Sequence, residues 1–183
     1  LMLLLLLAIS TGCEIKIETD FDVNKEKKDA EQKAAALEAE IERKEEAQVA
    51  YDKGMEFSNV EDWDHAIECY TIAIDLDPGS SLAFFGRGIA QGGSGEFGKA
   101  IEDLSEAIKL DPDYHDAYRF RASAYGTSGN YDAAINDFSE AIRIEPENPT
   151  SYYSRGVKYS RLGKYKRAVT DFSEAIRLET TNP

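Results

Sequence analysis

The sequence has 183 residues, with 35 acidic and 21 basic side chains and a formal net charge of −14. Such an acidic chain lacks the broad basic surface that phosphate contacts need, so we exclude nucleic acid as a partner. The two histidines and two cysteines are not spaced as a ligand set, and no glycine-rich phosphate loop follows a strand. No base is placed to activate a hydroxyl, so we predict no catalytic residue, no metal, no cofactor and no enzymatic activity.

The first twelve residues, 1–12, are predicted to be the remnant of a signal peptide. The run from Leu1 to Ile9 is almost purely apolar, too short to span a bilayer but long enough for the apolar part of a secretory signal. The small residues 10–12 before Cys13 resemble the bacterial lipobox, although Ser10 stands where an aliphatic residue is usual. That resemblance implies that Cys13 carries a lipid and that the protein is an exported, membrane-anchored lipoprotein of the bacterial cell envelope.

Two alternatives to the lipoprotein remain at this end of the chain. One is an ordinary cleaved signal, which would give a secreted or periplasmic protein, and the other is an N-terminal membrane anchor with Cys13 incidental. No start methionine or basic region precedes Leu1, so we expect the first few residues to be missing.

Two short segments follow the cysteine. Residues 13–24 are polar and offer no core, so we predict that they form a lipidated N-terminus and a flexible tether. Residues 25–46 are rich in Ala, Glu, Lys and Gln, with Ala34, Leu37 and Ile41 at helical spacing. We therefore expect a charged helix that leads into the rest of the chain.

Residues 47–182 repeat with a period of 34 residues, in the copies 47–80, 81–114, 115–148 and 149–182. Alanine recurs at two places in every copy, Ala66, Ala100, Ala134 and Ala168, then Ala73, Ala107, Ala141 and Ala175. A period of this length with small residues at fixed offsets indicates stacked helical hairpins. One hairpin cannot bury its apolar stripe alone, so neighbouring copies must stack.

The copies resemble tetratricopeptide repeats. The third copy has Tyr118-x2-Arg121-Ala122-x2-Tyr125, followed by Ala134-x3-Phe138 and Pro146. The fourth copy matches about as well, whereas the second has Gln91 where an aromatic residue is expected. The resemblance implies an all-α, right-handed α-solenoid of about four antiparallel hairpins. It also implies a non-catalytic adaptor or scaffold that binds a protein or peptide partner.

Helix patterning within the third copy supports this reading. In the stretch from Tyr131 to Ile144, apolar residues recur at spacings of three and four, so the intervening Asp137 is expected to face away from the core. Gly95, Gly129 and Gly163 mark the turn of each later hairpin. The second copy is rich in glycine, and we predict that residues 91–95 fray.

Three copies pair an arginine with an aspartate sixteen residues later. The pairs are Arg87 with Asp103, Arg121 with Asp137, and Arg155 with Asp171, while the first copy has Lys53 and Cys69 at these places. Joint loss of both partners predicts that the two positions face each other across the hairpin as a charge-assisted bridge. The alternative is coincidence among related copies. We interpret the remaining Cys69 as a small apolar filler.

The resemblance places a binding groove on the concave surface lined by the first helix of each hairpin. Its candidate residues, carried over by register, are Tyr51, Met55, Phe85, Ile89, Arg119, Ser123, Tyr153 and Val157. The best-known peptide-binding members of this family use Lys and Asn there to clamp a terminal carboxylate, and this chain does not. Aromatic residues with one arginine suit a mixed apolar and acidic partner segment. The alternative is an unused surface.

A second function class is a structural or self-assembling envelope protein without a dedicated peptide ligand. The first copy has one basic residue against eight acidic ones, and the fourth has seven against three. Ends of opposite charge favour head-to-tail contacts. The fourth copy also ends at Pro183 without the polar terminal helix that such arrays need, so we expect either a truncated chain or self-association through an uncapped C-terminal end.

Overall fold

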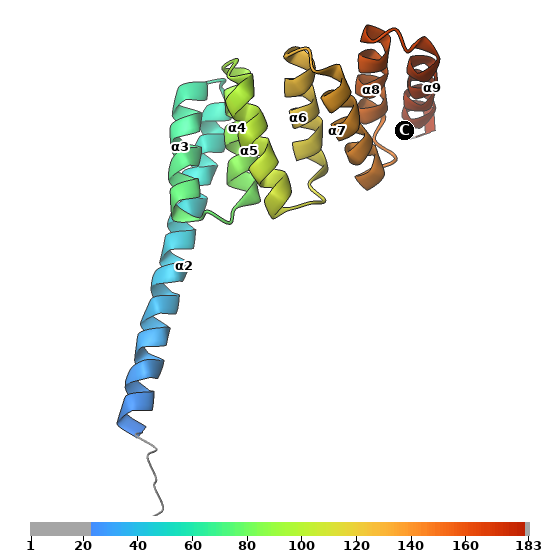
Figure 1. The fold of residues 1–183 in the computed structure, drawn as a ribbon. Helices are drawn as coiled ribbons and strands as arrows, with labels where there is room; N and C mark the ends of the chain where they lie inside the picture. The colour runs from blue at the N-terminus through green and yellow to red at the C-terminus, as the bar shows by residue number, and fades with distance from the viewer. Residues whose placement is uncertain (1–22, 182–183) are drawn as a thin grey trace, which may run out of the picture. The chain divides into compact units, whose positions relative to one another are not determined.

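The computed structural model describes residues 23–181, which form eight α-helices and no strand (Figure 1). The helices are α2 (Val23–Asn59), α3 (Trp63–Leu76), α4 (Ser81–Gly93), α5 (Phe97–Leu110), α6 (His115–Thr127), α7 (Tyr131–Ile144), α8 (Pro149–Arg161) and α9 (Tyr165–Thr181). The all-α solenoid expected from the repeat is thereby confirmed. Contacts divide the chain into one unit up to Ile41 and another from Glu42 onward.

In the first unit, the described part is a single helical stretch, the beginning of α2. Every side chain from Glu26 to Ile41 is exposed, including the apolar Leu37 and Ile41. This stretch therefore has no core of its own. None of the described helices is long and apolar enough to cross a membrane. The predicted signal peptide and most of the predicted tether, including Cys13, lie outside the described residues.

In the second unit, helices pack in sequence, each of α3 to α8 against the next one along the chain. The repeated alanines lie in the helix interfaces, and all eight are at least 96% buried. The end of α2 joins the stack through Gly54, whose position lies against the ring of Tyr70 on α3. Small residues at fixed offsets thus set the spacing of the hairpins.

Four of the eight described helices begin at a side-chain cap. Asp62, Ser80, Asn130 and Asn148 each accept a hydrogen bond from a backbone N–H in the first turn of the following helix. Pro78, Pro112 and Pro146 each follow the C-cap residue of a helix, α3, α5 and α7 respectively. These signals were readable in the sequence and explain why the helix bounds follow the 34-residue period.

The glycines of α4 have a packing role that the sequence analysis missed. A Cβ on Gly86 would lie 2.6 Å from the Tyr70 ring, and one on Gly93 would lie 2.6 Å from the Trp63 ring. Helix α4 extends through Gly93, and the Glu96 N–H donates to the Gln91 carbonyl at 2.8 Å. The expected fraying of residues 91–95 stays a prediction, but these glycines make room for aromatic rings.

The turn inside each hairpin provides a matched test of backbone strain. Gly95, Gly129 and Gly163 have positive φ, and Glu61, at the same repeat position of the first hairpin, has φ of 59°. A side chain in this left-handed conformation costs about 1 kcal/mol. We expect Gly129→Ala to lower the free energy of unfolding by about that amount and Glu61→Gly to raise it, as measured by urea unfolding. Equal signs for the two changes would contradict the assignment.

Candidate functional site

An arginine–aspartate bridge is repeated in three hairpins. The Arg121 Nε and Nη2 atoms donate to the two Asp137 carboxylate oxygens, both at 2.8 Å, and the Arg87 and Arg155 pairs have the same bidentate geometry. The predicted pairing is confirmed. The expectation that Asp137 faces away from the core is wrong, since Asp137 is only 6% exposed.

Each of these arginines also reaches the preceding hairpin, which the sequence analysis did not foresee. The Nη1 atoms of Arg87, Arg121 and Arg155 donate to the hydroxyls of Thr71, Ser105 and Ser139, sixteen residues earlier. One guanidinium therefore joins three helices, for example α5, α6 and α7 at Arg121. A hydroxyl residue sixteen positions before each arginine was the available signal in the sequence.

The groove candidates fall into two groups by exposure. Met55, Ser123 and Tyr153 are exposed, whereas Tyr51, Phe85, Ile89, Arg119 and Val157 are half-buried. Among the half-buried residues, Phe85 packs between Tyr114 and Phe120, with ring centroids 4.7 and 5.5 Å apart, and Tyr51 packs on Tyr70. The predicted aromatic row is therefore partly structural, and only Tyr153 presents most of its ring to solvent.

A pocket of about 240 Å³ opens between α4, α5 and α6. Ile89 and Ser123, both predicted groove residues, lie in its lining. The other lining residues are Trp63, Gly88, Gly92, Gly93, Phe97, Ala100, Leu104, Phe120, Ala124 and Thr127. None of them is charged, so the pocket suits an apolar group.

A smaller depression of about 130 Å³ adjoins this pocket. The two share Phe120 and Ser123, and the depression adds Arg119, Phe138 and Ser154. The Arg119 Nη1 atom donates to Asp116 at 2.6 Å, and its guanidinium lies 5.9 Å from the Phe120 ring centre. The structure thus brings three predicted residues, Ile89, Arg119 and Ser123, to one place. Tyr51, Met55, Phe85, Tyr153 and Val157 do not line either hollow.

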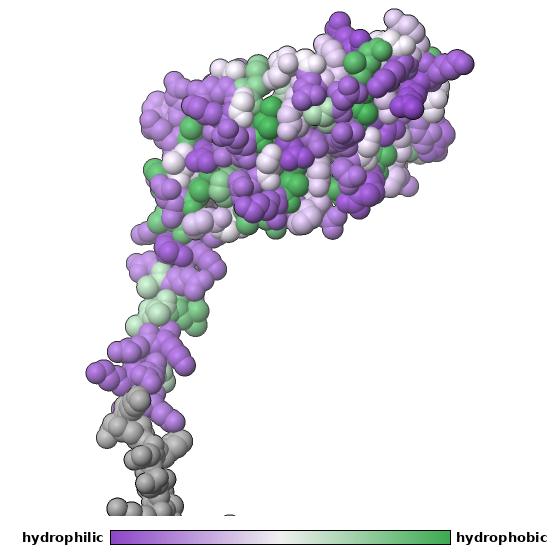
Figure 2. All heavy atoms as spheres, viewed as in Figure 1, coloured by the Kyte–Doolittle hydropathy of each residue, from purple (hydrophilic) through white to green (hydrophobic). Residues whose placement is uncertain are grey.

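Electrostatics along the first helices follow from packing. Burial against its neighbours raises the pKa of the Tyr114 phenol well above its usual range, so Tyr114 stays neutral beside Phe85. A Cβ added at Gly126 would lie 2.6 Å from the Lys158 Nζ atom. Burial lowers the pKa of Lys158, and the positive charge of Arg161 lowers it further. In the view of Figure 2, the surface of the helix stack is largely hydrophilic, with apolar residues in small groups.

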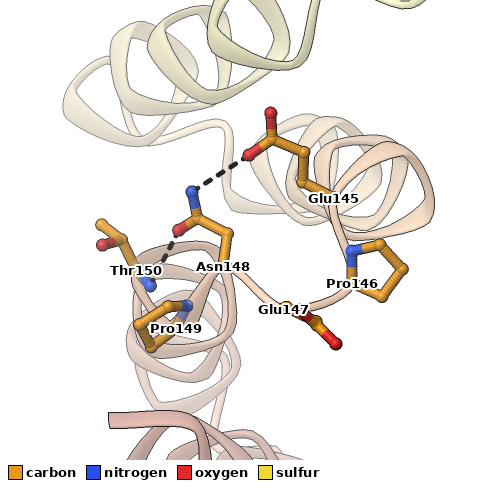
Figure 3. A pocket seen from close by; sticks show the side chains of 6 residues that line it. All are labelled: Glu145, Pro146, Glu147, Asn148, Pro149 and Thr150. Carbon is orange, nitrogen blue, oxygen red and sulfur yellow. Dashed lines mark hydrogen bonds between the residues drawn. The ribbon is translucent and has the colours of Figure 1, made fainter. Parts of the chain in front are cut away.

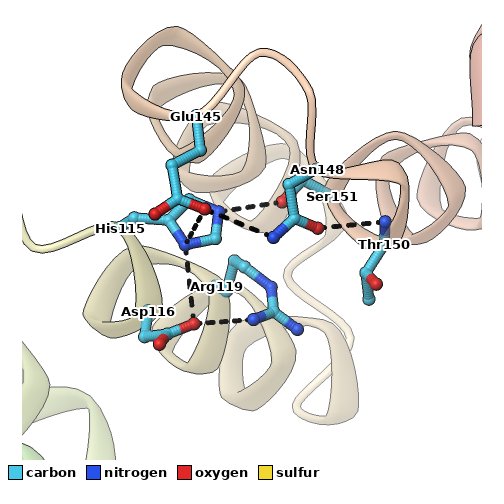
Figure 4. A network of polar contacts seen from close by, with 7 residues as sticks. All are labelled: His115, Asp116, Arg119, Glu145, Asn148, Thr150 and Ser151. Carbon is cyan, nitrogen blue, oxygen red and sulfur yellow. Dashed lines mark hydrogen bonds and ion pairs between the residues drawn. The ribbon is translucent and has the colours of Figure 1, made fainter. Parts of the chain in front are cut away.

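A polar network joins α6 to the start of α8 (Figure 4). His115 is buried and contacts two side chains. Its Nε2 atom lies 3.3 Å from the Ser151 hydroxyl oxygen, and its Nδ1 atom lies 3.3 Å from a carboxylate oxygen of Glu145. Arg119 enters the same network through Asp116, whose carboxylate lies 3.5 Å from His115 Nδ1. The contact with Asp116 positions Arg119. Ser151 is fully buried, so the network does not present a reactive hydroxyl to solvent.

The remaining features of the described residues add no second site. The hollow at residues 145–150 is formed by one turn alone, where Asn148 caps α8 (Figure 3). Among the described residues no group of three or more His, Cys, Asp or Glu side chains is arranged to hold a metal ion. Cys69 is partly buried on α3 and forms no disulfide with any residue in the described range.

Comparison with known proteins supports the repeat assignment. Residues 94–129 and 122–163 match a family model described as TPR repeat, and residues 149–182 match one described as tetratricopeptide repeat. Tetratricopeptide repeats are thereby confirmed between residues 94 and 182. None of the curated proteins matches this chain.

Several solved structures share the fold. The crystal structure of MamA aligns with a TM-score of 0.72 at 29% identity, over 74% of this chain and 79% of MamA. The first TPR of Spaghetti (RPAP3), solved with the HSP90 peptide SRMEEVD, aligns with a TM-score of 0.64 at 26% identity over 66% of this chain and 95% of that chain. The Arabidopsis OM64 TPR domain aligns with a TM-score of 0.63 at 26% identity over 64% and 98%. The fold is that of a protein-interaction module.

Register placed Ile89, Arg119 and Ser123 on the first helices, but it did not predict the hollows that these residues line. The pocket beside Ile89 was missed, although the sequence contained its signal in Leu104, which stands where the third copy has Phe138. The His115 network was also missed, because its partners are separated by up to 36 residues and follow no repeated pattern.

Proposed function

We propose that this protein is a non-catalytic adaptor, tethered to a bacterial membrane, that binds a peptide or partner protein along α4, α6 and α8. The observation that carries this proposal is the convergence of an uncharged pocket with Arg119 at an adjoining depression. Peptide grooves commonly combine an apolar pocket, which provides affinity, with a charged side chain, which orients the peptide. The peptide bound to the first TPR of Spaghetti supports the same use of this fold.

The peptide chemistry differs from that of clamp-type members. This chain lacks the Lys and Asn residues that clamp a terminal carboxylate in the best-known peptide-binding relatives. Its pocket and Arg119 favour an internal segment that carries apolar and acidic side chains. We therefore expect free C-terminal carboxylates to contribute little to affinity.

Substitution of Ser123 tests the groove. Ser123 is exposed and lines both hollows, so Ser123→Trp should obstruct them without disturbing the core. We expect peptides selected from a random display library on the full chain to bind Ser123→Trp at least tenfold more weakly. Thr170→Trp is the matched control, because Thr170 is exposed on α9 and lines neither hollow. Equal affinities for the two variants would refute the groove.

Tethering rests on Cys13 and is tested separately. In the native host, the full-length protein should take up an alkyne-labelled fatty acid and sediment with membranes. Cys13→Ala should lose the label and leave the membrane fraction. Retention of Cys13→Ala in membranes with no label on the parent protein would favour the N-terminal anchor instead.

Self-association is the second candidate function, and one observation favours it. Helix α9 exposes Val169 at 63%, whereas Ile135, one repeat earlier, is 7% exposed. Tyr165 and Ile176 are exposed on the same helix. Sedimentation of the parent protein and of Val169→Glu checks this alternative: a concentration-dependent dimer that Val169→Glu abolishes would support it, and a monomer at all concentrations would remove it.

A further inference from the structure

We infer that the pocket between α4, α5 and α6 binds one large apolar side chain of the partner peptide, with Arg119 pairing with an acidic side chain next to it. The inference rests on the proposed function and specifies its ligand. It depends on how the second hairpin differs from the third, on the position of Arg119 in the lining of the adjoining depression, and on the open space at Gly92.

The pocket lies where other hairpins hold aromatic rings. In the third hairpin, Phe138 and Tyr125 pack against Ala122 and Ala134 in one cluster. At the corresponding places the second hairpin has Leu104, Gln91, Gly88 and Ala100, of which the first three are smaller or non-aromatic and Ala100 is unchanged. Three of them, all except Gln91, line the pocket. The hollow thus occupies the volume that larger side chains fill in the third hairpin. Its apolar walls therefore suit an aromatic ring or a branched aliphatic side chain from a partner.

Gly92 keeps the pocket open. A Cβ at this position would meet no atom within 4 Å, although Gly92 lines the pocket and is part of a helix. Glycine inside a helix is less favourable than alanine by up to about 1 kcal/mol, and no neighbouring atom requires it here. Space for a guest side chain is a physical reason for glycine at this position.

The charge beside the pocket selects the neighbouring residue of the peptide. Arg119 is the only charged residue in the linings of the two hollows. Only its Nη1 atom has a hydrogen bond to a described residue, so Nη2 and Nε can donate to a further carboxylate. Adjacent residues of a peptide are 3.8 Å apart, which allows a ring in the pocket and a carboxylate at Arg119 together.

Capped dipeptides test the inference on the full-length protein. N-acetyl-Phe-Glu amide, N-acetyl-Phe-Gln amide and N-acetyl-Ala-Glu amide are titrated into the ¹⁵N-labelled chain, and amide shifts of Gly92, Ser123 and Thr127 are followed. We expect the Phe-Glu compound to shift these amides and the Ala-Glu compound not to do so. The Phe-Gln compound should bind about threefold more weakly, and Arg119→Gln should remove that difference.

Two glycine variants provide the matched control. Gly92→Leu fills the pocket, while Gly98→Leu places the same side chain in open space on α5, outside the lining. Loss of the Phe-Glu shifts in Gly92→Leu but not in Gly98→Leu supports the inference, with circular dichroism confirming that both fold. The inference is overturned by absent shifts in the parent chain, by equal binding of the Ala-Glu compound, or by shifts that survive Gly92→Leu. If any of these results occurred while Ser123→Trp still weakened the binding of library-selected peptides, the groove would be supported and only the pocket assignment would be wrong.

Discussion

Replacing Asp137 with alanine is expected to lower the free energy of unfolding by about 3–5 kcal/mol, the cost of leaving a buried charge without its partner. Arg121 would keep its charge with both bidentate hydrogen bonds lost, and among the described residues only Ser105 would remain as a hydrogen-bond partner. The Asp137 side chain is 9% exposed and that of Arg121 is 17% exposed, so water cannot replace the carboxylate freely. The loss should be visible as a lower urea midpoint by circular dichroism.

Two further variants separate this bridge from an ordinary ion pair. Arg143 bonds Glu140 and Asp113 but is 58% exposed, so Arg143→Ala should change stability by less than about 1 kcal/mol. The double variant Arg121→Met with Asp137→Leu should recover much of the loss, because it removes both charges. A loss for Asp137→Ala no larger than that for Arg143→Ala would contradict the structural role of the bridge.

Removing the Tyr70 ring is the second change with a large expected effect. Tyr70 is 3% exposed and packs between the end of α2 and α4, where Gly54 and Gly86 each lie against its ring. We expect Tyr70→Ala to cost about 3–5 kcal/mol, as for other large aromatic residues in a core. Tyr70→Phe loses only the contact between its hydroxyl and Ser58, at 3.3 Å, and should cost about 1 kcal/mol.

A double-mutant cycle with Gly86 makes this prediction specific. In the parent chain, Gly86→Ala places a Cβ 2.6 Å from the Tyr70 ring and should destabilise the fold. In the Tyr70→Ala background, the same methyl group has space and a helix-favouring residue replaces glycine, so Gly86→Ala should be neutral or stabilising. Measured by urea unfolding, an identical effect in both backgrounds would show that the two residues do not share this contact.

The sequence predicted the fold well because its signals are local and repeated. The signals are the repeated alanines, the turn glycines and the prolines after the second helix of a hairpin. Each acts within one or two turns of the chain, so the same signal in several copies predicts the same local structure. The Arg121 pairing was predictable for the same reason, since three copies carry it and the first lacks both partners. The burial of Asp137 was not predicted, because helical periodicity alone places it on the polar side of α7.

The candidate site was predictable only as a surface. Register placed Ile89, Arg119 and Ser123 on the first helices, but it also assigned Phe85 and Tyr51 to the groove, where they mainly pack against Tyr114 and Tyr70. Whether an aromatic side chain faces solvent depends on the neighbouring hairpin, which a single copy does not encode. The pocket arises from residues that are smaller than their counterparts, and an absence of volume becomes visible only when four helices are placed together.

The footprint of a bound peptide on the whole protein tests most directly whether the first helices form a binding groove. A peptide selected from a random library on the full chain would be titrated into the ¹⁵N-labelled protein, and all amide shifts mapped. We expect the largest shifts on α4, α6 and α8, around Ile89, Ser123 and Tyr153. A footprint centred instead on Val169 and Ile176 of α9 would contradict a groove on the first helices and would assign binding to the end of the stack.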